Sequence, residues 1–96
     1  MKIKVKGYVT LRKAMDNKAV LEMEMADATI RDLLGHLSER FGKDFTDLIF
    51  DPSTGEISGH IRILVNGRHY THLPNLLDTE LKEGDEVALF PPVAGG

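Results

Sequence analysis

The sequence contains no cysteine, and this absence excludes several kinds of site. Without a thiol the chain can form no disulfide, thiolate metal site or iron–sulfur cluster, and it cannot carry a persulfide on its own side chain. It also lacks any apolar run near the ~20 residues of a spanning helix, and residues 1–6 alternate instead of forming the apolar stretch of a signal peptide. We therefore expect a cytoplasmic protein with no membrane partner.

Neither sign of charge dominates, because 12 basic residues stand against 15 acidic ones for a formal net charge of -3. This balance gives no overall attraction to nucleic acid, which is therefore not an expected partner. A chain of 96 residues, 42% of them hydrophobic, can bury one core but has no room for a second. We expect one domain over residues 1–90 and a flexible C-terminal tail over residues 91–96.

Alternating side chains predict two strands at the start of the chain. In residues 2–6, Ile3 and Val5 face one way and the three lysines face the other. We expect residues 8–11 to continue this strand beyond Gly7, and the polar residues 16–18 to form a turn. Residues 19–25 alternate again, so the two strands predict an N-terminal hairpin.

The period then lengthens to that of a helix. Apolar residues fall on one side of it, namely Ile30, Leu33, Leu34, Leu37 and Phe41. Thr29 can cap its first turn, with Asp32 placed to complete a capping box, and Gly42 can end it. A single apolar stripe of this kind can be buried only against the sheet.

The second half of the chain predicts three more strands. Residues 45–50 are interpreted as connection, residues 51–55 as a loop and residues 56–58 as a short extended piece. The dipeptide Asn66-Gly67 favours a two-residue hairpin turn between residues 61–65 and 68–70. Residues 82–85 form a turn, and residues 86–90 form the last strand, with Val87 and Leu89 facing the core.

This order of elements predicts an α+β protein. It fits a β-grasp, or ubiquitin-like, arrangement in which a mixed sheet of four to five strands packs on one main helix. The first and last strands would then be parallel neighbours at the centre of the sheet. Propensity alone leaves other α+β topologies open.

The last six residues, Pro91-Pro92-Val93-Ala94-Gly95-Gly96, point to chemistry at the chain end. The two prolines have no backbone donor, so the strand must stop before them. The residues that follow are small and uncharged, and two terminal glycines form a thin thread whose carboxylate can enter a narrow active site. At ~3.3 Å per residue, residues 94–96 would extend roughly 10 Å from the domain.

A carboxylate is a poor electrophile, so a chain that reacts through its C-terminus needs activation, typically as a mixed anhydride with AMP formed from ATP. Glycine places no side chain beside the acyl carbon to hinder attack. Because the chain has no cysteine, a carried sulfur would sit on the terminal carbonyl as a thiocarboxylate. The protein would then be a carrier and co-substrate, without catalytic groups of its own.

The C-terminal segment also resembles a known family, the MoaD and ThiS proteins, which includes the small subunit of molybdopterin synthase. The matching run is Leu81-Lys82-Glu83-Gly84-Asp85-Glu86-Val87-Ala88-Leu89-Phe90-Pro91-Pro92-Val93-Ala94-Gly95-Gly96. Weaker similarity runs through residues 29–34 and 63–67. The connection between Gly42 and His60 resembles that of the longer members, which need not all serve molybdopterin.

The resemblance implies that an E1-like adenylating enzyme of the MoaB, MoeB or ThiF type activates Gly96 with ATP, and that Gly96 becomes a thiocarboxylate. No cofactor would be bound permanently. The tail would enter the molybdopterin synthase large subunit, or another sulfur acceptor such as one for thiazole, cysteine or tRNA thiolation. By position, Gly96 reacts, Gly95 is the spacer, Pro91, Pro92, Val93 and Ala94 line the enzyme channel, and Phe90 contributes to the docking surface.

Two further features favour structural interpretations. His69 and His72 lack nearby acidic or thiol partners, so we expect exposed polar residues and no metal site. The lysines of residues 2–6 are interpreted as a solvated sheet face. The alternative is that they contact an acidic enzyme surface, in which case Arg62 and Arg68 could extend the stripe.

Three functions remain open at this point. The tail and the missing cysteines favour a sulfur carrier. The same tail would suit a ubiquitin-like modifier that acylates lysine amines to form isopeptide bonds. A plain β-grasp interaction domain, whose tail is incidental, is the third.

Overall fold

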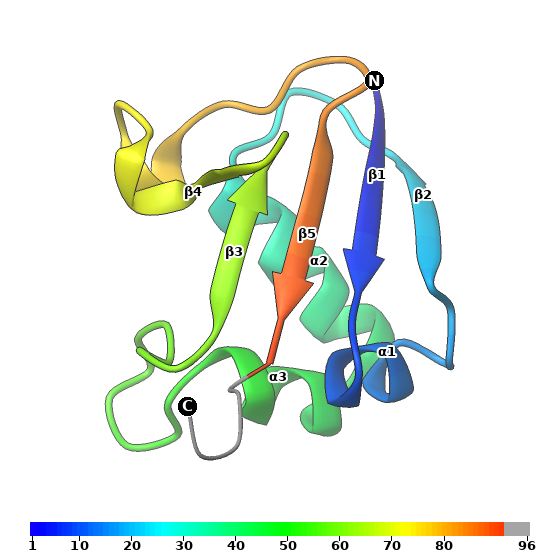
Figure 1. The fold of residues 1–96 in the computed structure, drawn as a ribbon, viewed down its shortest axis with the longest axis vertical. Helices are drawn as coiled ribbons and strands as arrows, with labels where there is room; N and C mark the ends of the chain where they lie inside the picture. Colours follow the sequence, from blue (N-terminus) through cyan, green and yellow to red (C-terminus); the bar gives the residue numbers. More distant parts are fainter. Residues whose placement is uncertain (92–96) are drawn as a thin grey trace.

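A five-stranded mixed sheet forms the frame of the structure, a computed structural model that describes residues 1–91 (Figure 1). The strands are β1 (Lys2–Gly7), β2 (Val20–Glu24), β3 (Arg62–Val65), β4 (Arg68–His69) and β5 (Glu86–Phe90), in the spatial order β2-β1-β5-β3-β4. β1 and β5 are parallel and the other neighbours are antiparallel. This confirms the predicted α+β class and the β-grasp topology.

The main helix, α2 (Ile30–Phe41), has the predicted bounds and caps. The Thr29 hydroxyl accepts a hydrogen bond from the Asp32 backbone N–H at 3.2 Å, and the Thr29 backbone N–H donates to Asp32 Oδ2 at 3.0 Å. The helix ends at Gly42, whose φ of 79° suits glycine. The first four residues of its apolar stripe are buried, so the stripe faces the sheet as expected.

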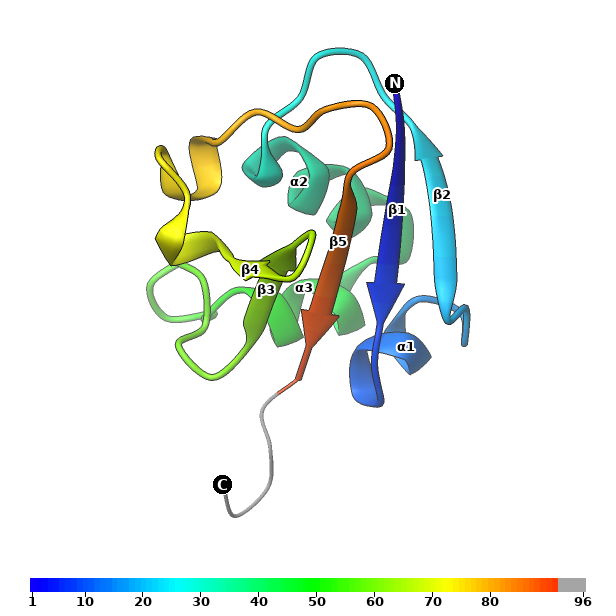
Figure 2. The same ribbon diagram turned by 45° about the horizontal axis from the view of Figure 1, so that its top comes forward.

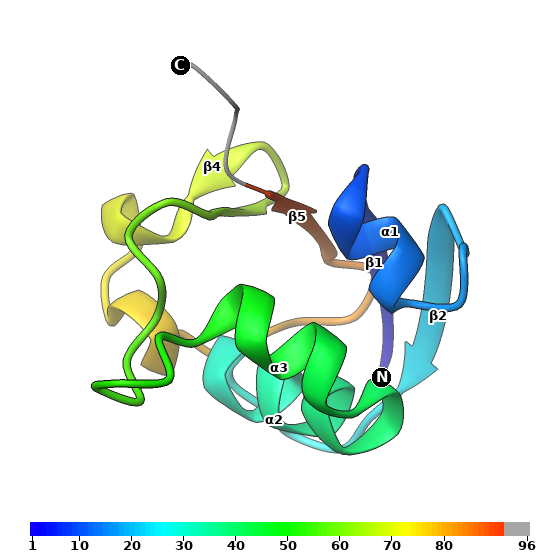
Figure 3. The ribbon, with the colours of Figure 1, turned by 90° about the horizontal axis from the view of Figure 1, so that it is seen from below.

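All the α-helices lie on one side of the sheet or at one end of it, which leaves the other side of the sheet open (Figure 3). The inward side chains of the strands are buried beneath α2. They include Ile3 and Val5 of β1, Ile63 of β3, and Val87 and Leu89 of β5, all with no exposed surface. The outward side chains of β1, β2, β3 and β5 form the surface that we call the open face.

The prediction that residues 8–11 continue the first strand is wrong, because β1 ends at Gly7. The chain turns at Val9, which has a φ of 52°, and a short helix, α1 (Thr10–Ala14), follows. Leu11 and Met15, four residues apart, are fully buried, so this segment closes one end of the core. β2 then begins after the predicted turn, in which Asp16 and Asn17 both have positive φ.

The interpretation of residues 45–50 as connection is also wrong, because α3 (Lys43–Ile49) occupies that segment. Phe45 and Ile49 lie one helical turn apart and are fully buried, which explains why the segment coils instead of running extended. The predicted extended piece at residues 56–58 is reduced to a single bridge between Phe50 and Ile57.

The Asn66-Gly67 hairpin is confirmed, since both residues have the positive φ (51° and 84°) that the favoured two-residue turn requires. The returning strand is shorter than predicted. β4 ends at His69, and the 3-10 helices η1 (Tyr70–His72) and η2 (Leu76–Asp78) follow. In residues 1–91 no helix is long and apolar enough to cross a membrane.

Candidate functional site

The point where the chain leaves the sheet fixes the geometry of the predicted site. Phe90 is the last residue of β5, and half-buried Pro91 follows it. Because β1 and β5 are parallel, with Gly7 beside Leu89, this exit lies at the end of the sheet that carries α1 (Figure 2). The other predicted site residues, Pro92, Val93, Ala94, Gly95 and Gly96, lie outside the described residues, so their roles stay predictions.

An aromatic pair lies at the base of this exit. The rings of Tyr8 and Phe90 are stacked, with centroids 4.4 Å apart and planes at 5°. The Tyr8 backbone N–H also donates to the Leu89 carbonyl at 3.2 Å, which joins the two segments. Phe90 therefore points away from buried Leu89, onto the open face, and Tyr8 holds it there.

Sequence reasoning missed Tyr8, although a signal was present. Alternation places even-numbered residues of β1 on the open face, and Tyr8 keeps that parity before the turn at Val9. The predicted parallel pairing with β5 then brings it beside Phe90.

The surface around the stack is apolar. Leu64 pairs with Ala88 across β3 and β5, both are half-buried, and Arg62 pairs with Phe90. We define the tail-base patch as Tyr8, Leu64, Ala88 and Phe90. Val9, beside it in sequence, is 70% exposed and has the left-handed φ that a β-branched residue rarely adopts. A partly exposed apolar surface where the chain leaves the sheet is suited to contact with a partner protein.

The predicted lysine stripe is balanced by acidic side chains. On the open face Lys2 lies opposite Glu24 and Lys4 opposite Glu22 in the neighbouring strand. Lys6 Nζ lies 3.3 Å from Glu86 Oε1. The half of the open face away from the tail is thus a mixed-charge surface, which favours the interpretation as a solvated face.

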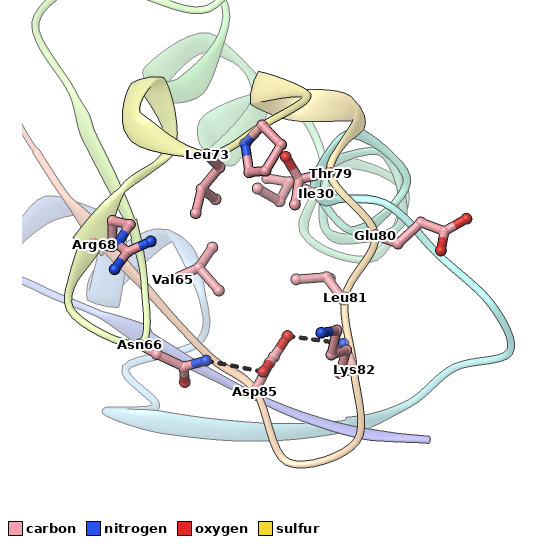
Figure 4. Close-up of a pocket in the computed structure, with 11 residues that line it drawn as sticks. Ile30, Val65, Asn66, Arg68, Leu73, Thr79, Glu80, Leu81, Lys82 and Asp85 are labelled. Carbon is pink, nitrogen blue, oxygen red and sulfur yellow. Dashed lines mark hydrogen bonds between the residues drawn. The ribbon is translucent and has the colours of Figure 1, made fainter.

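The two arginines do not extend that stripe together. Arg62 lies on the open face opposite Phe90, at the tail end of the sheet. Arg68 pairs with buried Val65, so it lies on the helix side and lines a cavity of about 360 Å³ (Figure 4).

This cavity lies at the other end of β5 from the tail, between β3, β4 and the segment that leads into β5. Its floor is apolar and includes Ile30 and Leu81. Its main acid, Asp85, accepts hydrogen bonds from Asn66 Nδ2 at 2.9 Å and from the Lys82 backbone N–H at 2.8 Å (Figure 4). These bonds hold the hairpin turn against the start of β5, so the carboxylate has a structural role.

His69 and His72 have ring centroids 6.3 Å apart, and His69 Nδ1 lies 2.8 Å from the Thr71 hydroxyl. His69 also stacks on Tyr70. Among residues 1–91 no group of three or more His, Asp and Glu side chains is placed to hold a metal ion.

Comparison with known proteins shows the family of the chain. A family profile described as the ThiS family matches residues 8–96. Small archaeal modifier protein 3 of Haloferax volcanii is 35% identical over 96 residues, which is the whole of both chains. A protein of Archaeoglobus fulgidus, named provisionally as a sulfur carrier protein, is 39% identical over 80 residues, or 83% of this chain and 88% of the relative.

The fold is shared with solved structures. The solution structure of small archaeal modifier protein 1 from Methanosarcina acetivorans superposes with a TM-score of 0.81 at 31% identity, covering 99% of this chain and 96% of the other. Family profile, relatives and fold agree. The chain belongs to the ThiS family, a group of ubiquitin-like sulfur carriers and modifiers.

Proposed function

We propose that the protein is a sulfur carrier whose Gly96 carboxylate is adenylated by an E1-like enzyme and converted to a thiocarboxylate. The observation that carries this proposal is the family match, which extends through residue 96 and so includes the terminal Gly-Gly. Adenylation uses ATP bound by the partner and releases pyrophosphate. A sulfur nucleophile then attacks the acyl carbon and displaces AMP.

The described geometry supports separate roles, with docking by the folded domain and reaction at the C-terminal tail. The tail-base patch lies where β5 ends, and the six residues beyond Phe90 could reach roughly 20 Å if extended. An enzyme that takes the carboxylate into its active site must therefore meet the surface around Phe90. Arg62, exposed beside Phe90, suits an acidic group near the mouth of that site.

The sulfur acceptor is inferred from the C-terminal sequence. Residues 81–96 resemble MoaD, so we infer that the carrier serves as the small, non-catalytic subunit of molybdopterin synthase and supplies sulfur for the dithiolene. Other acceptors, in thiamine, cysteine or tRNA thiolation, would use the same chemistry at Gly96.

The test is the intact mass of the protein isolated from its own cells, with and without the sulfur-donor pathway. We expect a mass increase equal to the exchange of one oxygen for sulfur, mapped to Gly96 and lost without the donor. A variant lacking Gly96 is the matched control and should show no increase. An unmodified mass in every condition, with no adenylation by any E1-like enzyme of that cell, would refute the proposal.

Protein modification is the second candidate, and the name of the Haloferax relative, a modifier protein, favours it. The same acyl-adenylate would then pass to lysine amines and form isopeptide bonds. Tagged chain should appear in larger adducts that carry the C-terminal residues on a lysine. Such adducts should be absent from the variant that lacks Gly96. Thiocarboxylate without adducts would assign the chain to sulfur transfer alone.

A further inference from the structure

The strand β2 is an outer edge of the sheet with no neighbour on its far side in residues 1–91 (Figures 1 and 3). Met1 and Met25 exchange two backbone hydrogen bonds, of 2.8 and 2.7 Å. Antiparallel pairs alternate between bonded and non-bonded residues, so the next bonded pair inward is Ile3 with Met23. The backbone N–H and C=O groups of Glu22 and Glu24 therefore point outward, free to pair with another strand.

A groove lies beside this edge, between β2 and α2. Its volume is about 290 Å³, and it is lined by Met23, Glu24, Met25, Ala26, Asp27, Ala28, Asp32 and His36. The two methionines provide an adaptable apolar floor. The rim is acidic, and hydrogen bonds from Thr29 lower the pKa of Asp32 and keep it ionised. Glu24 Oε1 lies 3.5 Å from the Met1 ammonium. Asp27 is exposed to solvent.

The charges on β2 disfavour pairing with a second copy of the chain. An antiparallel copy centred on Glu22 would place Glu22 beside Glu22 and Val20 beside Glu24. Like charges directly opposite each other destabilise a strand pair. A parallel copy in register would also place glutamate beside glutamate. Lys2 and Lys4 lie one strand further in, about 5 Å more distant from an added strand.

We propose that the β2 edge binds an extended segment of a partner protein in which Lys or Arg alternates with apolar residues. Its backbone pairs with Glu22 and Glu24, its cationic side chains lie beside those two carboxylates on the open face, and its apolar side chains enter the groove over Met23 and Met25. This binding adds a sixth strand to the sheet.

This site is separate from the tail. β1 lies between β2 and β5, and Glu24 lies opposite Lys2, whereas the chain leaves the sheet beside Gly7 at the other end of β1. A partner on the β2 edge therefore leaves the tail-base patch uncovered. The inference does not rest on the proposed function, because it uses no residue of the tail.

The test is a titration of the isotope-labelled full chain with a capped Lys-Val-Lys-Val-Lys peptide, followed by amide chemical shifts. We expect saturable shifts at Val20–Met25 and His36. The acidic peptide Glu-Val-Glu-Val-Glu should bind at least about tenfold more weakly, because its carboxylates would lie beside Glu22 and Glu24, and a tenfold change in the dissociation constant corresponds to only about 1.4 kcal/mol. Backbone N-methylation of the basic peptide should abolish binding, because its donors are lost. A combined Glu22→Gln and Glu24→Gln variant should lose the preference for the basic peptide.

The matched control is Glu56→Gln, an exposed acid in a distant loop, which should leave the titration unchanged. Equal binding of both peptides would overturn the proposal. So would undiminished binding of the N-methylated peptide, or shifts confined to the tail-base patch. Concentration-dependent self-association that broadens the β2 amides without peptide would assign the edge to a second copy instead.

Discussion

At the scale of single residues, the contact between Tyr8 and Phe90 joins the first and last strands where the tail begins. Stacked aromatic pairs contribute about 0.5–1.5 kcal/mol beyond the area that they bury. We predict a coupling energy of about 1 kcal/mol between Tyr8→Ala and Phe90→Ala in a double-mutant cycle, measured by urea unfolding. Additive effects would contradict the stack.

Gly7 marks a close approach between β1 and α1. A Cβ atom there would lie 2.8 Å from the Sδ of Met15, which is fully buried, and 3.3 Å from the Arg12 backbone nitrogen. We predict that Gly7→Ala lowers the free energy of unfolding by about 1–3 kcal/mol, because the core must shift to accept the methyl group. Chemical denaturation would measure it.

The control for this prediction is the same substitution in open space. Gly35 lies exposed in the middle of α2, and a Cβ there would meet nothing within 4 Å. Gly35→Ala should raise the free energy of unfolding by roughly 0.5–1 kcal/mol through helix propensity. If both substitutions had the same sign, crowding at Gly7 would be the wrong explanation.

At the scale of elements, the capping box of α2 makes the stability of the fold depend on pH. Hydrogen bonds from the Thr29 backbone and side chain lower the pKa of Asp32 below its ordinary value. A carboxyl with a lowered pKa in the folded state stabilises the fold fully above its unfolded-state pKa and loses that contribution as pH falls through the folded-state value. We predict that wild type exceeds Asp32→Asn in free energy of unfolding at pH 7 and that the difference shrinks below about pH 4.

Urea denaturation of both chains across this pH range would measure the difference. Thr29→Ala removes only the side-chain hydrogen bond, so in that background the pH-dependent part should be reduced and still present. A difference that grew on acidification would have the wrong sign for a lowered pKa.

The elements also show what sequence patterns can predict. α2 was predictable because five apolar residues repeat at helical spacing between a capping threonine and a glycine. α1, together with the residue that follows it, buries Leu11 and Met15, and α3 buries Phe45 and Ile49, each a pair four residues apart. Two positions do not define a period, and only tertiary burial selects a helix there.

In the candidate site, too, some features could be predicted from the sequence and others required the structure. The outward position of Phe90 follows from strand alternation, whereas its partner Tyr8 depends on the register of two segments distant in sequence. The neutralisation of the lysine stripe by Glu22, Glu24 and Glu86 likewise required the strand pairing. The groove beside β2 could not be predicted, since it forms between a strand end and a helix.

At the scale of the whole molecule, the buried core and the proposed reaction lie in different parts of the chain. Within residues 1–91, the buried side chains lie between Ile3 and Leu89, and the tail-base patch lies within residues 8–90. We predict that deletion of Gly95 and Gly96 leaves the thermal melting temperature unchanged and abolishes adenylation. The truncated chain should nevertheless inhibit adenylation of the full chain competitively, because its docking surface is intact.

The complementary variant is Phe90→Ala in the full-length chain. It retains the C-terminal carboxylate but should lose about 2 kcal/mol of docking free energy, which is typical when an aromatic residue at the centre of an interface is truncated. The variant should therefore be a poor substrate and a poor inhibitor. ATP–pyrophosphate exchange by the E1-like enzyme of the same cell measures both variants. If the truncated chain failed to compete, the binding energy would reside in the tail itself, and the tail-base patch would serve only to anchor the last strand.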